Sequence, residues 1–292
     1  MILREKLDKV IERITKNQFS DDIYEARKDY QKVAGEIYED DKSYEARMGL
    51  FLEWYIFDRK LPGRELSPLE ALIADNGYAE SGDEATAIKD FTDNVHSLFL
   101  IKKVRDSEVV VLDLFEDKKY TVKENEGKLI FQKNEIFEAR IILDNGNYYF
   151  TGNFCFHPRD AARYIKEEIK KVVTVREGYL KELKKKNSQL KDYNSGLEKN
   201  AREVEKFNSK ILDSKSVDKI RVWNEKLEDL KKVRSELMQQ VSMVEGEIAN
   251  LKTQRLKTEI DDLSNLLMQR LGYMNLKWER SRQIDLNDIY RN

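Results

Sequence analysis

Apolar residues recur every three or four positions through the first part of the chain, which is the pattern of amphipathic helices. An almost continuous apolar run at 50–57 predicts one helix between about 43 and 60, and Pro62-Gly63 ends that pattern. Ser67-Pro68-Leu69-Glu70 then combines a capping Ser, a Pro at the first helical position and a Glu three residues after the cap. This combination predicts another helix start. We therefore expect an N-terminal helical domain over residues 1–95.

The pattern changes to a period of two between residues 96 and 157. Short β-rich runs follow one another there, reading SLFLIKKV, EVVVLDLF, KYTVKE, KLIF, IFEARIIL and NYYFTGNFCF. The Asn145-Gly146 step between the last two is a strong hairpin signal, because both positions accept positive φ. Five or six short strands in about 60 residues predict a small β-sheet or barrel-like module over residues 96–157.

A heptad pattern occupies residues 158–272. From Ile165 to Ile211, eleven of the 14 core positions are apolar, and nine of ten are apolar in a second frame from Ile220 to Leu251. A one-residue skip follows before Leu256 continues the stripe. A heptad repeat sustained over this length predicts a coiled coil.

Two chain paths fit this coiled coil. The phase is lost at the segment Asp213, Ser214, Lys215 and Ser216, which divides the repeat into two arms of nearly equal length. Equal arms favour an antiparallel hairpin with its tip at 213–216, and Ser216 is placed to cap the second arm. The segment contains no Gly or Pro, so a parallel dimeric rod stays open. We expect the tail, residues 273–292, to dock on the rest of the chain, with a partner-binding peptide as the alternative.

The composition agrees with a helix-rich chain, since 37% of the residues are charged and only 12 Gly and 3 Pro occur in 292 residues. The predicted fold class is α+β: an N-terminal helical domain, a small β-barrel-like module and a long antiparallel coiled-coil hairpin. The charged start and the lack of a long apolar run predict a cytoplasmic protein with no membrane span. A single cysteine, Cys155, excludes an internal disulfide.

Catalytic motifs are not evident in the sequence. His96 and His157 are the only histidines and lie far apart, so we expect no metal site. Glycine-rich phosphate loops and nucleophile elbows do not occur, and the paired carboxylates lie within charged, solvated patterns. The sequence therefore predicts no catalytic residue, no cofactor and no enzyme.

One carboxylate needs an explanation, because Glu53 lies inside the apolar run at 50–57 with no cation three or four residues away. In one interpretation it occupies a narrow solvated strip of a mostly buried helix. In the other, Glu53 or Asp58 pairs with Arg140, the lone cation of IFEARIIL, and forms a latch between the helical domain and the β module. Phe51, Trp54 and Phe57 are then expected in the core of that seam.

The same stretch, FLEWYIFDRKLPGRELSPLEALI, fits the pattern F-x-E-W-x-x-F-D-R-x-L followed by [ST]-P-[LI]-E. It resembles uncharacterised bacterial proteins, mainly of delta-proteobacterial type. The resemblance covers about residues 45–155 and implies a helical lead-in to a β module with the steps Asp113-Leu114 and Ala139-Arg140. It implies no activity and transfers no catalytic residue.

Charge is distributed unevenly, with 14 basic and 22 acidic residues in 1–97 but 30 basic and 23 acidic residues in 158–292. We expect a non-enzymatic coiled-coil scaffold or adaptor that binds a protein partner, or assembles with itself, through the hairpin. One alternative is a nucleic-acid-associated protein that uses the basic first arm at 159–191, where the candidate face comprises Lys181, Lys184, Lys185 and Lys191. A second alternative is a small-molecule sensor at the helix–barrel junction.

Overall fold

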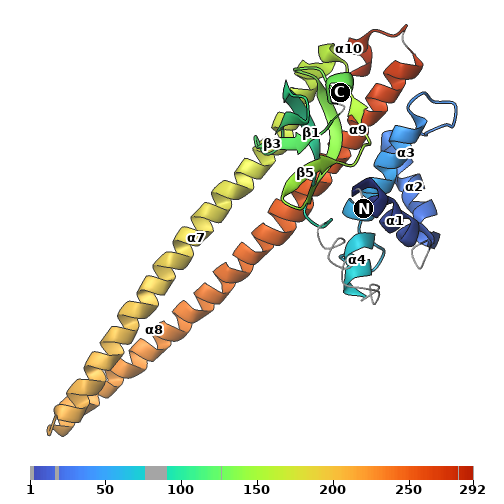
Figure 1. Ribbon diagram of the computed structural model, residues 1–292. Helices are drawn as coiled ribbons and strands as arrows, with labels where there is room; N and C mark the ends of the chain where they lie inside the picture. Colours follow the sequence, from blue (N-terminus) through green and yellow to red (C-terminus); the bar gives the residue numbers. More distant parts are fainter. Residues whose placement is uncertain (1–2, 17–19, 76–90, 126, 282, 292) are drawn as a thin grey trace. The chain divides into compact units, whose positions relative to one another are not determined.

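The computed structural model describes residues 3–16, 20–75, 91–125, 127–281 and 283–291. The chain divides into two compact units. We call residues 1–173 together with 263–292 the body, and residues 174–262 the arm. Figure 1 shows the elements of each unit along the chain.

The N-terminal part of the body is helical, as the sequence predicts. It contains α1 (Leu3–Lys16), α2 (Ser20–Ala34), α3 (Tyr44–Glu53) and α4 (Pro68–Ala74). The start of α4 is a full capping box: Ser67 Oγ accepts a hydrogen bond from the Glu70 backbone N–H, and Glu70 Oε2 accepts one from the Ser67 N–H. Residues 76–90 of the predicted helical domain lie outside the described residues.

The helix predicted over about 43–60 changes its winding partway. After α3 the chain forms a π-helical turn, η1 (Trp54–Asp58), in which the Arg59 N–H donates to the Trp54 carbonyl five residues earlier at 2.9 Å. Tyr55 and Ile56 of this turn are fully buried in the helical core, where they join Phe51. The apolar run thus provides the centre of that core.

The β module is a six-stranded sheet. Its strands are β1 (Asn94–Val104), β2 (Glu108–Asp113), β3 (Lys119–Lys123), β4 (Ile136–Asp144), β5 (Asn147–Phe150) and β6 (Cys155–Phe156). The strand order is β1-β2-β3-β5-β4-β6, and β1 also pairs with β4. Asn145 and Gly146 both have positive φ, 49° and 77°, in the predicted two-residue turn between β4 and β5.

The small sheet predicted for this module is present, but it is not a true barrel. Five strands pair in a cycle, and an odd number of strands cannot alternate in direction all the way around, so one pair must be parallel. That pair is β3–β5, which is joined by only two residue pairs, Val122 with Tyr148 and Lys123 with Tyr149. The KLIF run is not a strand either. It lies in a short helix, α6 (Gly127–Ile130), and in the residue after it.

The arm is an antiparallel pair of helices (Figure 1). A short 3-10 turn, η2 (Arg159–Ala161), leads into α7 (Ala162–Asp213), which ends where the tip was predicted, and α8 (Val217–Asn250) follows. Cross-arm contacts join Tyr179 to Glu259, Lys186 to Glu247 and Asn200 to the Leu230 carbonyl. The apolar seam positions predicted within the arm are all buried or half-buried.

The one-residue skip after Leu251 has a structural counterpart. The second helix of the arm continues through a π-helical segment, η3 (Leu251–Glu259), into α9 (Ile260–Arg280). Because π winding closes i to i+5 hydrogen bonds, it takes up one extra residue and keeps the apolar stripe on one side. The Leu251 to Leu256 step is such a five-residue interval, and Ile260 is buried after it.

The predicted end of the helix at residue 272 differs from the structure, because α9 continues to Arg280. Gly272 lies inside this helix, and its carbonyl accepts a hydrogen bond from Arg47 Nη1 at 2.9 Å. Beyond α9, α10 (Leu286–Ile289) is the short helix expected in the tail.

Candidate functional site

Strand β4 separates two apolar cores of the body. Phe137, Ala139 and Ile141 point into the core of the sheet, whereas Ile142 belongs to the core of the helices. Side chains alternate along a strand, so Glu138 and Arg140 share the face that carries Ile142. A carboxylate and a guanidinium therefore face the helical part of the body from within an apolar strand.

Arg140 is the centre of a buried ionic cluster, and its side chain is 1% exposed. Its Nη2 donates to Asp58 Oδ2, and its Nε lies 3.6 Å from Glu53 Oε2. Its Nη1 donates to Asn94 Oδ1, and its guanidinium carbon lies 4.5 Å from the ring centroid of Phe57. The structure thus brings the three residues of the predicted latch together, although their role as a latch stays a prediction.

The π-helical turn explains how two carboxylates five residues apart reach one arginine. In an α-helix, five residues rotate by about 500°, which leaves their side chains about 140° apart. A turn closed by an i to i+5 hydrogen bond brings such residues nearly into line. Glu53 immediately precedes this turn and Asp58 ends it. The local winding therefore aims both carboxylates at the same strand.

Two members of the cluster were missed from the sequence, His96 and Glu138. The register of β1 and β4 places His96 directly opposite Arg140. His96 Nε2 lies 3.0 Å from Glu138 Oε1, and Nδ1 lies 3.2 Å from both Asp58 Oδ2 and Asn265 Oδ1. One signal for this cluster was present in the sequence. Glu138 and Arg140 lie two residues apart within an apolar strand, and this spacing implies that they form a polar patch on one face of it.

Burial and pairing shift the pKa values of this cluster. Burial and the Arg140 charge both lower the pKa of His96, but hydrogen bonds to Asp58 and Glu138 outweigh them and raise it to about 9. Burial raises the pKa of Glu53, and Arg140 and the 2.6 Å hydrogen bond from Asn153 Nδ2 offset only part of that effect. For Asp58 the balance is reversed. Burial opposes ionisation, yet Arg140 and His96 lower the pKa of the carboxyl.

This arrangement suits a structural contact better than a reacting site. Glu53 and Arg140 are each 1% exposed, so neither presents an open face to a substrate. The two carboxylates near His96 contact different nitrogens of its ring, so the three groups do not converge on one position where an ion could bind. Across the described ranges, no group of three or more His, Cys, Asp or Glu side chains has the arrangement of a metal site.

The predicted seam residues occupy different parts of the body. Phe51 is buried in the helical core, where its ring, that of Tyr30 and that of Trp54 form one aromatic cluster, with the Tyr30 centroid 5.4 Å from that of Phe51 and 5.3 Å from that of Trp54. Phe57 instead contacts Arg140 of β4. Of these three aromatic residues, Phe57 is therefore the one that contacts the buried ionic cluster.

The tip of the arm has a short backbone turn. Residues 214–216 join α7 to α8, and the Ser216 N–H donates to Ser214 Oγ at 3.2 Å. Ser216 stands at the cap position but its side chain makes no capping hydrogen bond, unlike the prediction. Leu212 and Val217 flank the turn and are 85% and 80% exposed.

The predicted basic face lies on the outer side of α7. Lys181, Lys184, Lys185 and Lys191 are all exposed. In the heptad they occupy positions opposite the seam. Lys186, next to them, instead pairs across the arm with Glu247 at 2.6 Å.

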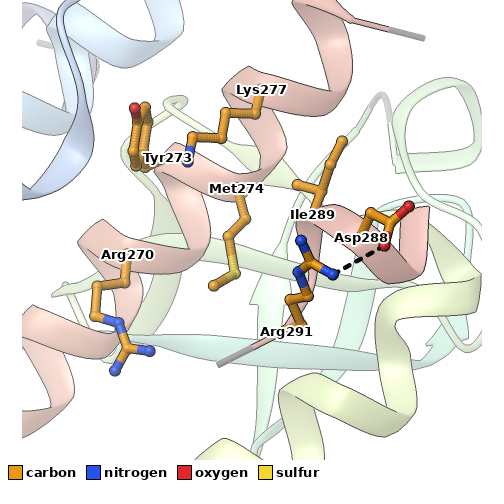
Figure 2. A pocket seen from close by; sticks show the side chains of 7 residues that line it. All are labelled: Arg270, Tyr273, Met274, Lys277, Asp288, Ile289 and Arg291. Carbon is orange, nitrogen blue, oxygen red and sulfur yellow. Dashed lines mark hydrogen bonds and ion pairs between the residues drawn. The ribbon is translucent and has the colours of Figure 1, made fainter. Parts of the chain in front are cut away.

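A pocket of about 320 Å³ is lined by residues of α9 and by residues 288–291. Figure 2 shows Arg270, Tyr273, Met274 and Lys277 of α9 on one side, and Asp288, Ile289 and Arg291 on the other. Arg291 pairs with Asp288 at 3.0 Å, and Lys277 Nζ lies 4.2 Å from the Tyr273 ring centroid. Tyr290, between Ile289 and Arg291 of the lining, is buried, and its hydroxyl lies 3.2 Å from His157 Nδ1. Arg270 and Lys277 give the pocket a basic wall.

Comparison with known proteins gives a family but no activity. Neither a curated protein nor a solved structure matches the chain. Among the described helices, none has the length and apolar character needed to cross a membrane. The model of one protein family matches residues 2–194, which include the helical part, the sheet and the first part of α7. The chain therefore belongs to a family of unknown function, DUF7986.

Proposed function

We propose that the protein is a non-enzymatic scaffold or adaptor that binds a partner protein through its arm, which acts as an antiparallel coiled coil. The tip, with Leu212 and Val217, is the proposed contact point. We retain the cytoplasm as its expected location. The buried ionic cluster serves in this proposal to fix the helices of the body on the sheet, and it takes no part in a reaction.

One observation carries the proposal. Leu212 and Val217 are among the most exposed apolar side chains of the described chain, and they lie on either side of a three-residue turn. Large exposed apolar side chains that are close together mark interaction surfaces in soluble proteins. A helix pair with a single apolar seam needs no further apolar residue at its end, so these two side chains have no evident role in the arm's own folding.

Exposed apolar residues also continue along the arm. Val175, Leu180, Val222, Val233, Met238 and Met243 are all exposed. Their exposed fractions lie between 37% and 61%, below the 85% and 80% of Leu212 and Val217 at the tip. This contrast favours the tip over the sides of the arm as the principal contact and provides matched control positions.

The test compares tip and side variants of the tagged full-length protein. Leu212→Asp with Val217→Asp removes the apolar tip, and Val233→Asp with Met238→Asp makes the same chemical change at exposed side positions. Proteins retained from a lysate of the source organism are quantified by mass spectrometry, and the best candidate is then purified and titrated. We expect a partner that binds the wild type and the side variant but binds the tip variant at least about tenfold more weakly, as loss of an apolar hot spot predicts.

Self-association is the second form of the same proposal. In that case light scattering gives a multiple of the 34.6 kDa chain mass for the wild type, and the tip variant returns to the monomer. Equal binding and equal mass for wild type, tip variant and a deletion of residues 176–254 would remove the proposal in both forms.

The basic face of α7 supports a second candidate, nucleic-acid association. Within the described chain, Lys181, Lys184, Lys185 and Lys191 have no carboxylate at ion-pair distance, and they lie on one side of the helix. Such a face would bind phosphates with an affinity that falls steeply with salt. A gel shift at low salt tests this candidate: retention of a nucleic acid that K184E/K185E abolishes supports it, and no retention removes it.

A further inference from the structure

A second basic pocket, in the β module, is independent of the arm. It has a volume of about 490 Å³ and is lined by Lys102, Lys103, Lys128 and Lys133 around Val104 and Phe131. All four lysines are exposed, whereas Phe131 is buried at the floor. Among the residues that the structure describes, no acidic side chain lines the pocket, and Lys128 pairs with Asp106, which is not part of the lining.

A β-bulge gives this pocket two neighbouring lysines. Ile101 pairs with Val111 and Lys103 with Val110, so Lys102 is an extra residue in β1. In a regular strand, adjacent residues point to opposite faces, and one of the two lysines would point into the apolar core. The bulge resets the alternation, and both side chains reach solvent.

The other two lysines are also held by the fold. The turn at 132–135 is fixed to the bulge, because the Asn134 N–H donates to the Ile101 carbonyl at 2.9 Å and the Ile101 N–H donates to the Glu135 carbonyl at 3.0 Å. This places Lys133 beside β1. Gly127, at the start of α6, packs so closely on β2 that a Cβ would lie 2.7 Å from Val109. This contact holds the start of α6 against β2, and the next residue, Lys128, lines the pocket.

The residue that follows Lys128 of this pocket has an exposed apolar side chain. Leu129, which follows Lys128 in α6, is 87% exposed and is the most exposed of the large apolar residues described. Membrane surfaces with anionic lipids attract lysines, and an exposed leucine beside them can enter the headgroup region. We propose that this face of the β module binds the surface of a membrane containing anionic phospholipid, with a phosphate headgroup in the lysine pocket and Leu129 inserted beside it.

The lining distinguishes a lipid from a nucleic acid as the occupant. Single-stranded nucleic acid is commonly held by exposed aromatic rings on which bases stack. The only aromatic side chain lining this pocket, Phe131, is 3% exposed and belongs to the core of the sheet. The exposed apolar group is aliphatic, which suits acyl chains. The positive charge of the four lysines complements an anionic membrane surface, and the exposed Leu129 suits its acyl chains. Both features therefore favour a lipid surface as the occupant.

The experiment is co-sedimentation of the full-length protein with vesicles of phosphatidylglycerol and phosphatidylcholine, and with vesicles of phosphatidylcholine alone. We expect binding to the anionic vesicles only. K102E/K103E should weaken binding by at least about tenfold, because each lysine near an anionic surface contributes about a fivefold factor. Leu129→Ser should weaken it by a smaller factor and leave its salt dependence unchanged.

Matched controls decide between a built site and general charge attraction. K184E/K185E makes the same charge change on the arm and should bind as the wild type does. Equal loss in both double variants, or no sedimentation of the wild type with anionic vesicles, overturns the proposal. Binding of inorganic pyrophosphate or of single-stranded DNA that depends on Lys102 and Lys103, without vesicle binding, would show a free phosphate or a nucleic acid as the occupant and would also overturn it.

Discussion

The body and the arm obtain their structure in different ways. The body depends on contacts that do not repeat along the chain, made by side chains from distant parts of the sequence. Examples are the contacts among Asp58, His96, Glu138 and Arg140. In the arm, apolar residues recur along one seam, and few residues are buried, among them Leu227, Val244 and Ile248. We therefore expect the arm to tolerate substitution at most positions and the body to depend on a few singular contacts.

The largest effect is expected from breaking the ionic cluster on one side. Arg140→Met leaves Glu53 and Asp58 buried without their cation, which should lower the free energy of unfolding of the body by about 3 to 5 kcal/mol. Urea unfolding followed by hydrogen exchange in β4 measures this loss. The triple variant E53Q/D58N/R140M is the control and should recover much of the stability, since it removes the charges together. A loss below about 1 kcal/mol for Arg140→Met would contradict a latch role.

The second-largest expected effect is a loss of stability of the body at alkaline pH. The pKa of His96 is about 9 in the folded protein, above its ordinary value of 6.5, so folding favours the protonated ring. The resulting stability is complete below pH 6.5 and is lost as the pH rises through 9, by up to about 3 kcal/mol. Urea unfolding across this range should show the loss in the wild type and a flatter profile in His96→Gln. A wild-type profile as flat as that of the variant would mean that His96 is not held protonated.

A smaller, local effect is expected in the arm. Leu227→Ala should destabilise the helix pair by about 2 kcal/mol, the lower end for a core leucine, because the seam is narrow. Leu212→Ala is the matched control and should cost little, since that side chain is exposed. Hydrogen exchange should accelerate in α8 for Leu227→Ala and stay unchanged in β4. Equal acceleration in both would contradict the division into two units.

The smallest effect concerns the cross-arm ion pair. Lys186 and Glu247 are partly exposed, at 23% and 47%, so solvent screens their attraction and the pair should contribute little to stability. Lys186→Ala should therefore slightly increase exchange in the middle of the arm at low salt, and the difference should vanish at high salt. A large effect that persists in salt would point to a packing role for the lysine stem.

Periodic features of the chain could be predicted from the sequence and singular ones could not. The heptad frames gave the break at 213–216, and the one-residue skip corresponds to the π segment η3. Arg140 was recognisable as a lone cation in an apolar strand. His96 was not, because its partners lie 38 and 42 residues away and meet it only through strand register and the π turn at Asp58. Local patterns do not give the register between strands that are far apart in the sequence, such as β1 and β4.

The KLIF run shows the same limit on a smaller scale. Its apolar residues fit a strand, but residues 127–130 form the short helix α6, and Gly127 at its start packs closely against Val109 of β2. The incomplete closure of the sheet likewise depends on the short β3–β5 pairing, which no single strand reveals. The proposed headgroup site was missed for a related reason: two adjacent lysines in a strand pattern do not show that a bulge exposes both.

The most direct test of the proposed function is photo-crosslinking from the arm inside the source organism. A photoreactive phenylalanine analogue is placed at Leu212 or Val217, and at Val233 or Met238 as side controls. We predict one adduct, with the same partner or with a second copy of the chain, from both tip positions and little from the side positions. Adducts of equal yield at all four positions, or none at the tip, would contradict the proposal that the tip is the contact point.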